Sequence, residues 1–267
     1  MCFAGVATNL VRQQRFRLSD MTVKDKIVLC IPGVWESRSA FTQKLADEFS
    51  TQIMFAGMVL LDNQTDESVE SVFEDKSSNM LRAFDISGVY DPLDQNERDD
   101  LAAHNSVVYL ISRKSGIEEL RKLCRFATYL CKAGGLGVKN EIAGKSYSKT
   151  VWLEREHHFQ NELEALFYSA VFPLVNETDS EHFTVGMVQF GLPDAKLLGQ
   201  SDLNEAKHLL EVFNWYRLSE NPSIKVGHTF SLAPGEQLYR ISKSEHPYSD
   251  RDYMDYSEGM LVLTPVN

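Results

Sequence analysis

The segment from Asn105 to Lys139 constrains the fold more than any other stretch of the chain. It opens with a short apolar run, residues 107–111, which predicts a strand buried on both faces. After Ser115-Gly116, apolar residues recur at helical spacing and fall on one stripe, so they predict a core helix. These residues are Ile117, Leu120, Leu123, Cys124, Ala127, Leu130 and Cys131. Gly134-Gly135 is typical of a helix C-terminus, so we expect one strand–helix unit at the centre of the fold.

Together with this unit, the residues before it predict the element order β-α-β-β-α-α-β-α. The predicted strands are Lys26–Pro32, Ile53–Leu61 and Val69–Glu74. We expect Val69–Glu74 to lie at an exposed edge, because charged residues alternate along it. The order is close to a ferredoxin-like split βαβ arrangement with an extra helix.

The second half also predicts mixed α and β structure. Phe183–Leu192 is a predicted strand, a helix is expected after Asn204, and Met260–Val266 is the predicted last strand. Residues 226–232 and 237–242 are typical of an antiparallel pair around Pro234-Gly235. We therefore expect an α+β fold, with a mixed or antiparallel sheet and helices packed on it.

Residues 1–24 predict a poorly ordered arm, because three arginines follow its apolar stretch, the reverse of the order in a secretory signal. We expect residues 25–267 to form a single α+β domain, since no Pro- or Ser-rich linker divides them. Two related lobes, 25–148 and 149–267, remain an alternative. The alternative rests on a short echo between residues 56–59 and 185–188, each inside a predicted strand.

The charge of the chain is explained most simply by solubility, and it would also steer a basic partner. Its 27 basic and 38 acidic residues give a net charge of −11. Such a chain repels nucleic acid and anionic membrane, and attracts positively charged proteins. It has no apolar run of about 18 residues, so we expect no membrane-spanning helix. The four cysteines have no metal-ligand spacing and favour a cytosolic location.

Several patterns that suggest chemistry have plainer interpretations. Gly134–Gly137 follows a helix instead of leading from a strand into one, which favours a helix cap over phosphate binding. His157-His158 lacks the spacing of a zinc motif, and His158 with Glu162 favours an i,i+4 contact on a solvated helix face. We therefore expect no catalytic residues, metal site or cofactor.

One enzymatic alternative remains open at His228. It lies between two predicted strands, and its candidate partners are Ser231, Glu236 and Cys30. Such a set would suit a hydrolytic or small-molecule-binding enzyme if the residues met in a pocket. A histidine with a purely structural hydrogen bond is the simpler interpretation.

The acidic, tyrosine-rich segment Pro247–Gly259 is the candidate partner-binding site. It lacks the register of a calcium-binding EF-hand loop. Tyrosine offers rigid contact area and carboxylates pair with Lys or Arg across an interface, so the segment favours a contact surface or, equally, a solvated loop. The candidate residues are Tyr248, Asp250, Asp252, Tyr253, Asp255, Tyr256 and Glu258.

The chain resembles a bacterial family catalogued as domain of unknown function 4261. The resemblance runs from about Lys26 to the end and is carried by IVLCIPGVW, AGMVLLD, HNSVVYLIS, AGGLGVK and VGHTFS. The family is uncharacterised, so the resemblance implies no catalytic residues. By analogy, small acidic α/β proteins without a catalytic set are common among bacterial immunity proteins. We therefore expect a non-enzymatic, cytosolic immunity-type protein that neutralises a basic toxin or effector domain by masking it.

Overall fold

Strand β1 (Ile27–Gly33) lies between two apolar cores, and its side chains alternate between them. Ile27, Leu29 and Ile31 face a helical layer, whereas Val28 and Cys30 face the opposite side of the sheet. The computed structural model describes residues 24–250 and 254–266. The expected arm, residues 1–24, lies outside the described residues except for Lys24.

The first sheet has seven strands in the order β2-β3-β4-β5-β1-β6-β7, and every neighbouring pair is antiparallel. Strands β1 and β4 are thus parallel with β5 between them, and β5 and β6 are parallel with β1 between them. This is the ferredoxin-like split βαβ order predicted for the first half, with a hairpin and one strand added at its edges. The further strands are β2 (Ile53–Phe55), β3 (Val59–Asp62), β4 (Glu67–Asp75), β5 (Ser106–Ser112), β6 (Gly137–Asn140) and β7 (Lys145–Ser148).

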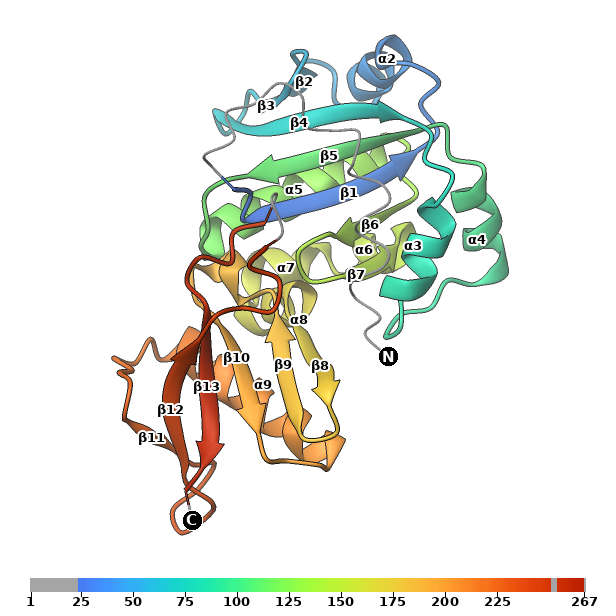
Figure 1. The fold of residues 1–267 in the computed structure, drawn as a ribbon. Helices are drawn as coiled ribbons and strands as arrows, with labels where there is room; N and C mark the ends of the chain where they lie inside the picture. The colour runs from blue at the N-terminus through green and yellow to red at the C-terminus, as the bar shows by residue number, and fades with distance from the viewer. Residues whose placement is uncertain (1–23, 251–253, 267) are drawn as a thin grey trace.

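Helices cover one face of this sheet. The predicted core helix is α5 (Ile117–Lys132), and Leu120, Leu123 and Ala127 on it are buried against β1 and β5. Figure 1 shows α5 behind these two strands. The same core includes residues of α2 (Arg38–Phe49), α6 (Lys149–Glu154), α7 (Glu156–Asn161) and α8 (Leu163–Ala170). Helices α3 (Met80–Ser87) and α4 (Gln95–Ala102) instead pack in the core on the opposite side of the sheet.

The second sheet has six strands in the order β11-β12-β13-β10-β9-β8. Its pair β10–β13 is parallel and the chain between them includes helix α9 (Leu203–Ser219), whose Leu210 and Phe213 pack on the sheet. The strands are β8 (Phe172–Thr178), β9 (Glu181–Val185), β10 (Asp194–Leu198), β11 (Thr229–Phe230), β12 (Tyr239–Ser244) and β13 (Met260–Pro265), with a 3₁₀ turn η1 (Met187–Phe190) after β9. The two sheets together confirm the α+β class.

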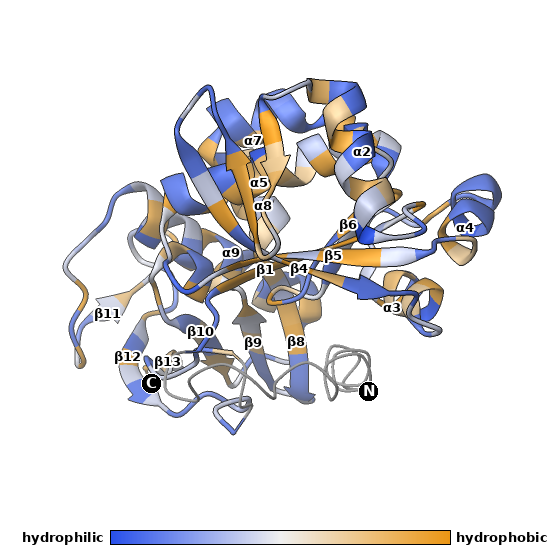
Figure 2. Ribbon diagram, turned by 90° about the horizontal axis from the view of Figure 1, so that it is seen from above, coloured by the Kyte–Doolittle hydropathy of each residue, from blue (hydrophilic) through white to orange (hydrophobic). Residues whose placement is uncertain are grey.

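The two sheets share a core. Val28 and Tyr109 of the first sheet pack in one cluster with Phe183 and Val185 of β9 and with Met254, which follows β12. Figure 2 shows apolar β1 and β5 between the helical layer and the second sheet, with the largely polar α4 at one side. No helix within the described residues is long and apolar enough to cross a membrane.

Three predicted strands differ from the structure. Ile53–Leu61 is interrupted by a turn at Gly57, whose φ is 74°, and Phe183–Leu192 ends at Gly186, whose φ is 126°. The echo at residues 56–59 and 185–188 therefore lies mainly in turns. Strand β4 is an interior strand, because the β2–β3 hairpin covers the edge at which it was expected.

Candidate functional site at the tail segment

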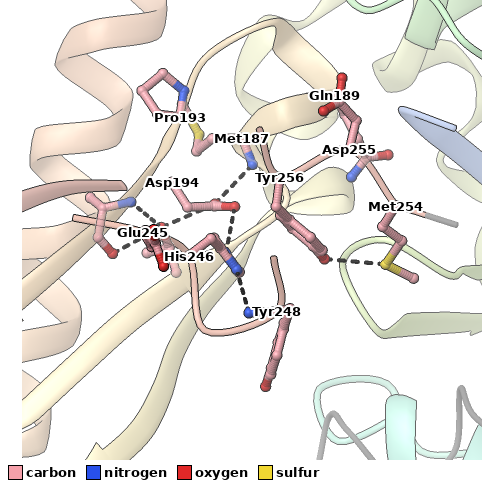
Figure 3. Close-up of polar contacts among 12 residues, drawn as sticks. Met187, Gln189, Pro193, Asp194, Glu245, His246, Tyr248, Met254, Asp255 and Tyr256 are labelled. Atoms are coloured by element: carbon pink, nitrogen blue, oxygen red, sulfur yellow. Dashed lines mark hydrogen bonds and ion pairs between the residues drawn. The ribbon is translucent and has the colours of Figure 1, made fainter. Parts of the chain in front are cut away.

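The tail segment, residues 245–259, connects β12 to β13 and reaches back to the first sheet (Figure 1). The segment is anchored by His246, which is 2% exposed and stacks on Tyr256 with ring centroids 4.0 Å apart. The Tyr248 backbone N–H donates to His246 Nδ1 at 3.0 Å. Since Nδ1 is an acceptor, the proton of the neutral ring lies on Nε2, which is 3.5 Å from Asp194 Oδ2 (Figure 3).

Asp194 is held by the second sheet and not by the tail segment alone. The Met187 backbone N–H donates to Asp194 Oδ1 at 3.1 Å, and the Thr184 hydroxyl lies 3.4 Å from the same oxygen. Asn214 on α9 donates to that hydroxyl at 3.0 Å. One carboxylate thus joins β9, β10, α9 and the tail segment.

Arg217 supplies a compensating positive charge. Its guanidinium donates to Asn214 Oδ1 and to the Pro193 carbonyl, both at 2.7 Å. Burial lowers the pKa of Arg217 to about 10, although the negative charge of Asp194 opposes this shift. A buried charge is tolerated when opposite charge and hydrogen bonds accompany it. We call Thr184, Asp194, Asn214, Arg217 and His246 the buried polar network.

The far end of the tail segment is attached to the start of β1. Met254 forms a parallel bridge with Asp25, and the Asp255 backbone N–H donates to the Asp25 carbonyl at 3.1 Å. Lys26 Nζ lies 3.4 Å from the Asp255 carboxylate, which also accepts hydrogen bonds from Ser257. Burial alone would raise the pKa of Asp255, but the Ser257 hydrogen bonds and the charge of Lys26 lower it overall.

The outward face of the tail segment is acidic. Glu245, Asp250 and Glu258 are exposed. Beside Glu245 and Glu258 lies an open hollow of about 570 Å³, a volume far larger than that of a single water site. It is lined by Lys243, Ser244, Glu245, His246, Ser249, Tyr256, Ser257, Glu258 and Gly259.

The structure divides the predicted partner-binding residues into two groups. Asp250 and Glu258 are exposed, whereas Tyr248 and Asp255 are half-buried and Tyr256 is only 4% exposed. Tyr256 therefore anchors the segment and offers little contact area. Asp252 and Tyr253 lie outside the described residues. The partner-binding role of the segment stays a prediction.

Sequence reasoning missed the buried polar network. Asp194, Arg217 and His246 come from separate elements, and no local spacing links them. One signal for the network was available in the sequence. Asp194 follows a predicted strand and Arg217 lies in a predicted helix, both in apolar surroundings, and charged residues are seldom buried without a partner.

The network does not have the geometry of a catalytic pair facing a ligand. Both ring nitrogens of His246 face protein groups, the Tyr248 amide and Asp194, and so neither faces the hollow as a proton donor or acceptor. No group of three or more His, Cys, Asp or Glu within the described residues could hold a metal ion.

The His228 alternative is not assembled. His228 is exposed, and its Nδ1 accepts the Lys225 backbone N–H at 3.4 Å. Cys30 is buried in β1 of the other sheet. Ser231 and Glu236 make no hydrogen bond with His228 in the part of the chain that the structure describes. By contrast, the predicted i,i+4 contact is confirmed, because His158 Nδ1 lies 2.7 Å from Glu162 Oε1.

Comparison with known proteins gives one match. A family model described as domain of unknown function (DUF4261) matches residues 183–254. This segment resembles that family, and the match is narrower than the resemblance expected from Lys26 onward. It begins in β9, ends at Met254, and contains every residue of the buried polar network. No curated protein and no solved structure matched the chain.

Proposed function

We propose that this chain is a non-enzymatic cytosolic protein of the bacterial immunity type, which masks a basic toxin or effector domain by binding it on the outward face of the tail segment. The observation that carries the proposal is the division of the side chains of that segment into buried and exposed ones. His246 and Tyr256 are buried, while Glu245, Asp250 and Glu258 are exposed, and Glu245 and Glu258 line an open hollow.

This arrangement suits protein binding for two physical reasons. The described residues of the segment are held at two places, His246 by the buried polar network and Met254 by its bridge to Asp25. Residues that are already held in place lose little conformational entropy on binding. The exposed carboxylates and the net charge of −11 attract a basic partner over distance and speed the encounter.

Growth rescue tests the proposal directly. The chain is co-expressed with the toxin or effector domain encoded beside its gene, under conditions in which that domain alone stops growth. We expect growth to be restored and the two purified proteins to form a stable complex. A neighbouring gene set devoted to metabolism, or a toxin that binds this chain without loss of toxicity, would count against an immunity role.

Salt dependence tests the electrostatic part. Raising NaCl from about 50 to about 500 mM shortens the Debye length from roughly 14 Å to roughly 4 Å. Association measured by stopped flow should therefore slow while dissociation changes less. The variant Glu245→Lys/Asp250→Lys/Glu258→Lys should slow association at low salt and retain the fold, because all three residues are exposed. Asp255 is excluded from this variant, since it pairs with Lys26.

A further inference from the structure

We infer that the hollow beside the tail segment receives a single arginine or lysine side chain of a protein partner. The inference rests on the proposed function and names a binding position within it. It is drawn from the floor of the hollow, from its rim, and from its size.

The floor of the hollow is formed by buried side chains. His246 and Tyr256 line it, and both are buried and stacked on each other. Gly259 also lines it, with a φ of 68°, and a Cβ at this position would lie 2.4 Å from the Ser244 carbonyl oxygen. Position 259 therefore excludes a side chain on both backbone and packing grounds.

The rim of the hollow presents hydrogen-bond acceptors. Glu245 and Glu258 are exposed, and neither carboxylate forms an ion pair or a hydrogen bond within the described residues. Ser249 adds a hydroxyl. Lys243 is the one Lys or Arg among the lining residues, so carboxylates outnumber fixed cations two to one. This balance favours a cationic group over an anionic one.

The size and openness of the hollow favour a protein side chain. A volume of about 570 Å³ accommodates a long side chain that enters from outside with its water. A guanidinium has five N–H donors in a planar fork and can bridge two carboxylates. Calcium instead needs six to eight oxygen ligands, and the rim offers two carboxylates.

A peptide titration followed by two-dimensional ¹⁵N NMR tests the inference. The probe is acetyl-Gly-Arg-Gly-amide, and its control is the same peptide with citrulline, which keeps the shape of arginine but has no charge. We expect the arginine peptide to shift the backbone amides of Glu245, His246 and Glu258, and the citrulline peptide to leave them unchanged. The variant Glu245→Gln/Glu258→Gln should weaken binding about tenfold or more, because charge-assisted hydrogen bonds are lost.

A matched variant separates the hollow from general electrostatics. Glu220→Gln/Glu236→Gln removes the same charge from two exposed residues that do not line the hollow. The inference is overturned if this control weakens binding as much, if the citrulline peptide causes equal shifts, or if the shifts map elsewhere. Equal shifts with calcium chloride alone would identify a metal site instead.

The outcome is separable from that of the proposed function. If the toxin complex forms and its stability is unchanged by Glu245→Gln/Glu258→Gln, the hollow is not the binding position and the masking role stands. If the arginine peptide binds at the hollow but the toxin is not neutralised, the cation site stands and the masking role fails.

Discussion

At the scale of single residues, like side chains in the tail segment have opposite environments. Asp250 is exposed, whereas Asp255 is half-buried beside Lys26 and Ser257. The alternation of tyrosines and carboxylates in the sequence favours a contact surface or a solvated loop, and the structure shows Asp250 and Glu258 exposed. The pattern does not show which residues turn inward, because this depends on contacts with two other residues. Asp25 is distant in the sequence, and His246 is not marked by any local pattern.

The first prediction concerns acid stability and Asp255. Because its pKa in the folded protein is below the ordinary value of 3.8, Asp255 contributes stability that is present above that value and is lost as pH falls through the folded pKa. Asp255→Asn should therefore destabilise the protein near neutral pH, and the difference from wild type should shrink below about pH 4. Urea unfolding across this range measures it, with Asp250→Asn as the control. A difference that is constant with pH would contradict the assigned ion pair and hydrogen bonds.

At the scale of elements, the second prediction concerns α5. Leu123 is fully buried between α5 and the first sheet. Leu123→Ala should cost about 2–5 kcal/mol in the free energy of unfolding, since it removes buried methyl groups and leaves a cavity. Chemical denaturation measures the loss, and Glu118→Ala on the same helix, where the side chain is 85% exposed, is the control. A loss under about half a kcal/mol, the size usual for surface substitutions, would place Leu123 outside the core.

The third prediction concerns the joint between α8 and β9. Gly186 has a φ of 126°, and a Cβ there would lie 2.1 Å from the Ala170 carbonyl oxygen. Gly227 also has a positive φ, but its Cβ would meet nothing within 4 Å. Gly186→Ala should therefore destabilise the protein clearly more than Gly227→Ala, because only the first adds a clash to the backbone strain. Equal thermal shifts for the two variants would contradict the close approach of β9 to α8.

Elements were predictable where one periodicity covers the whole segment. Strand β5 and helix α5 are such segments, and so is β1. Strand β7 was missed, because its sequence, Lys-Ser-Tyr-Ser, is polar although all four residues are buried. The position of β4 was wrong because alternation reports which face is buried and not which strands lie alongside.

At the scale of the whole molecule, the two sheets are tied together by a core that includes Tyr256 and Met254. The fourth prediction is that Tyr256→Ala, expected to cost about 3–5 kcal/mol by analogy with Phe→Ala, weakens both sheets. Hydrogen exchange should speed up in β1 as well as in β9 and β10, whereas Tyr216→Ala, at an exposed residue, should affect neither. Faster exchange confined to the second sheet would mean that the two halves unfold independently.

The bridge between Asp25 and Met254 has a consequence for synthesis on the ribosome. Strand β1 leaves the ribosome long before Met254 and Tyr256, which pack in the same apolar cluster, have been translated. Contacts between residues so distant in sequence also close slowly. Until they form, Val28 and Cys30 lack part of their cover, and unfinished apolar strands of this kind promote aggregation. A ribosome that stalls before the tail segment would thus release a chain whose central strand is still partly uncovered.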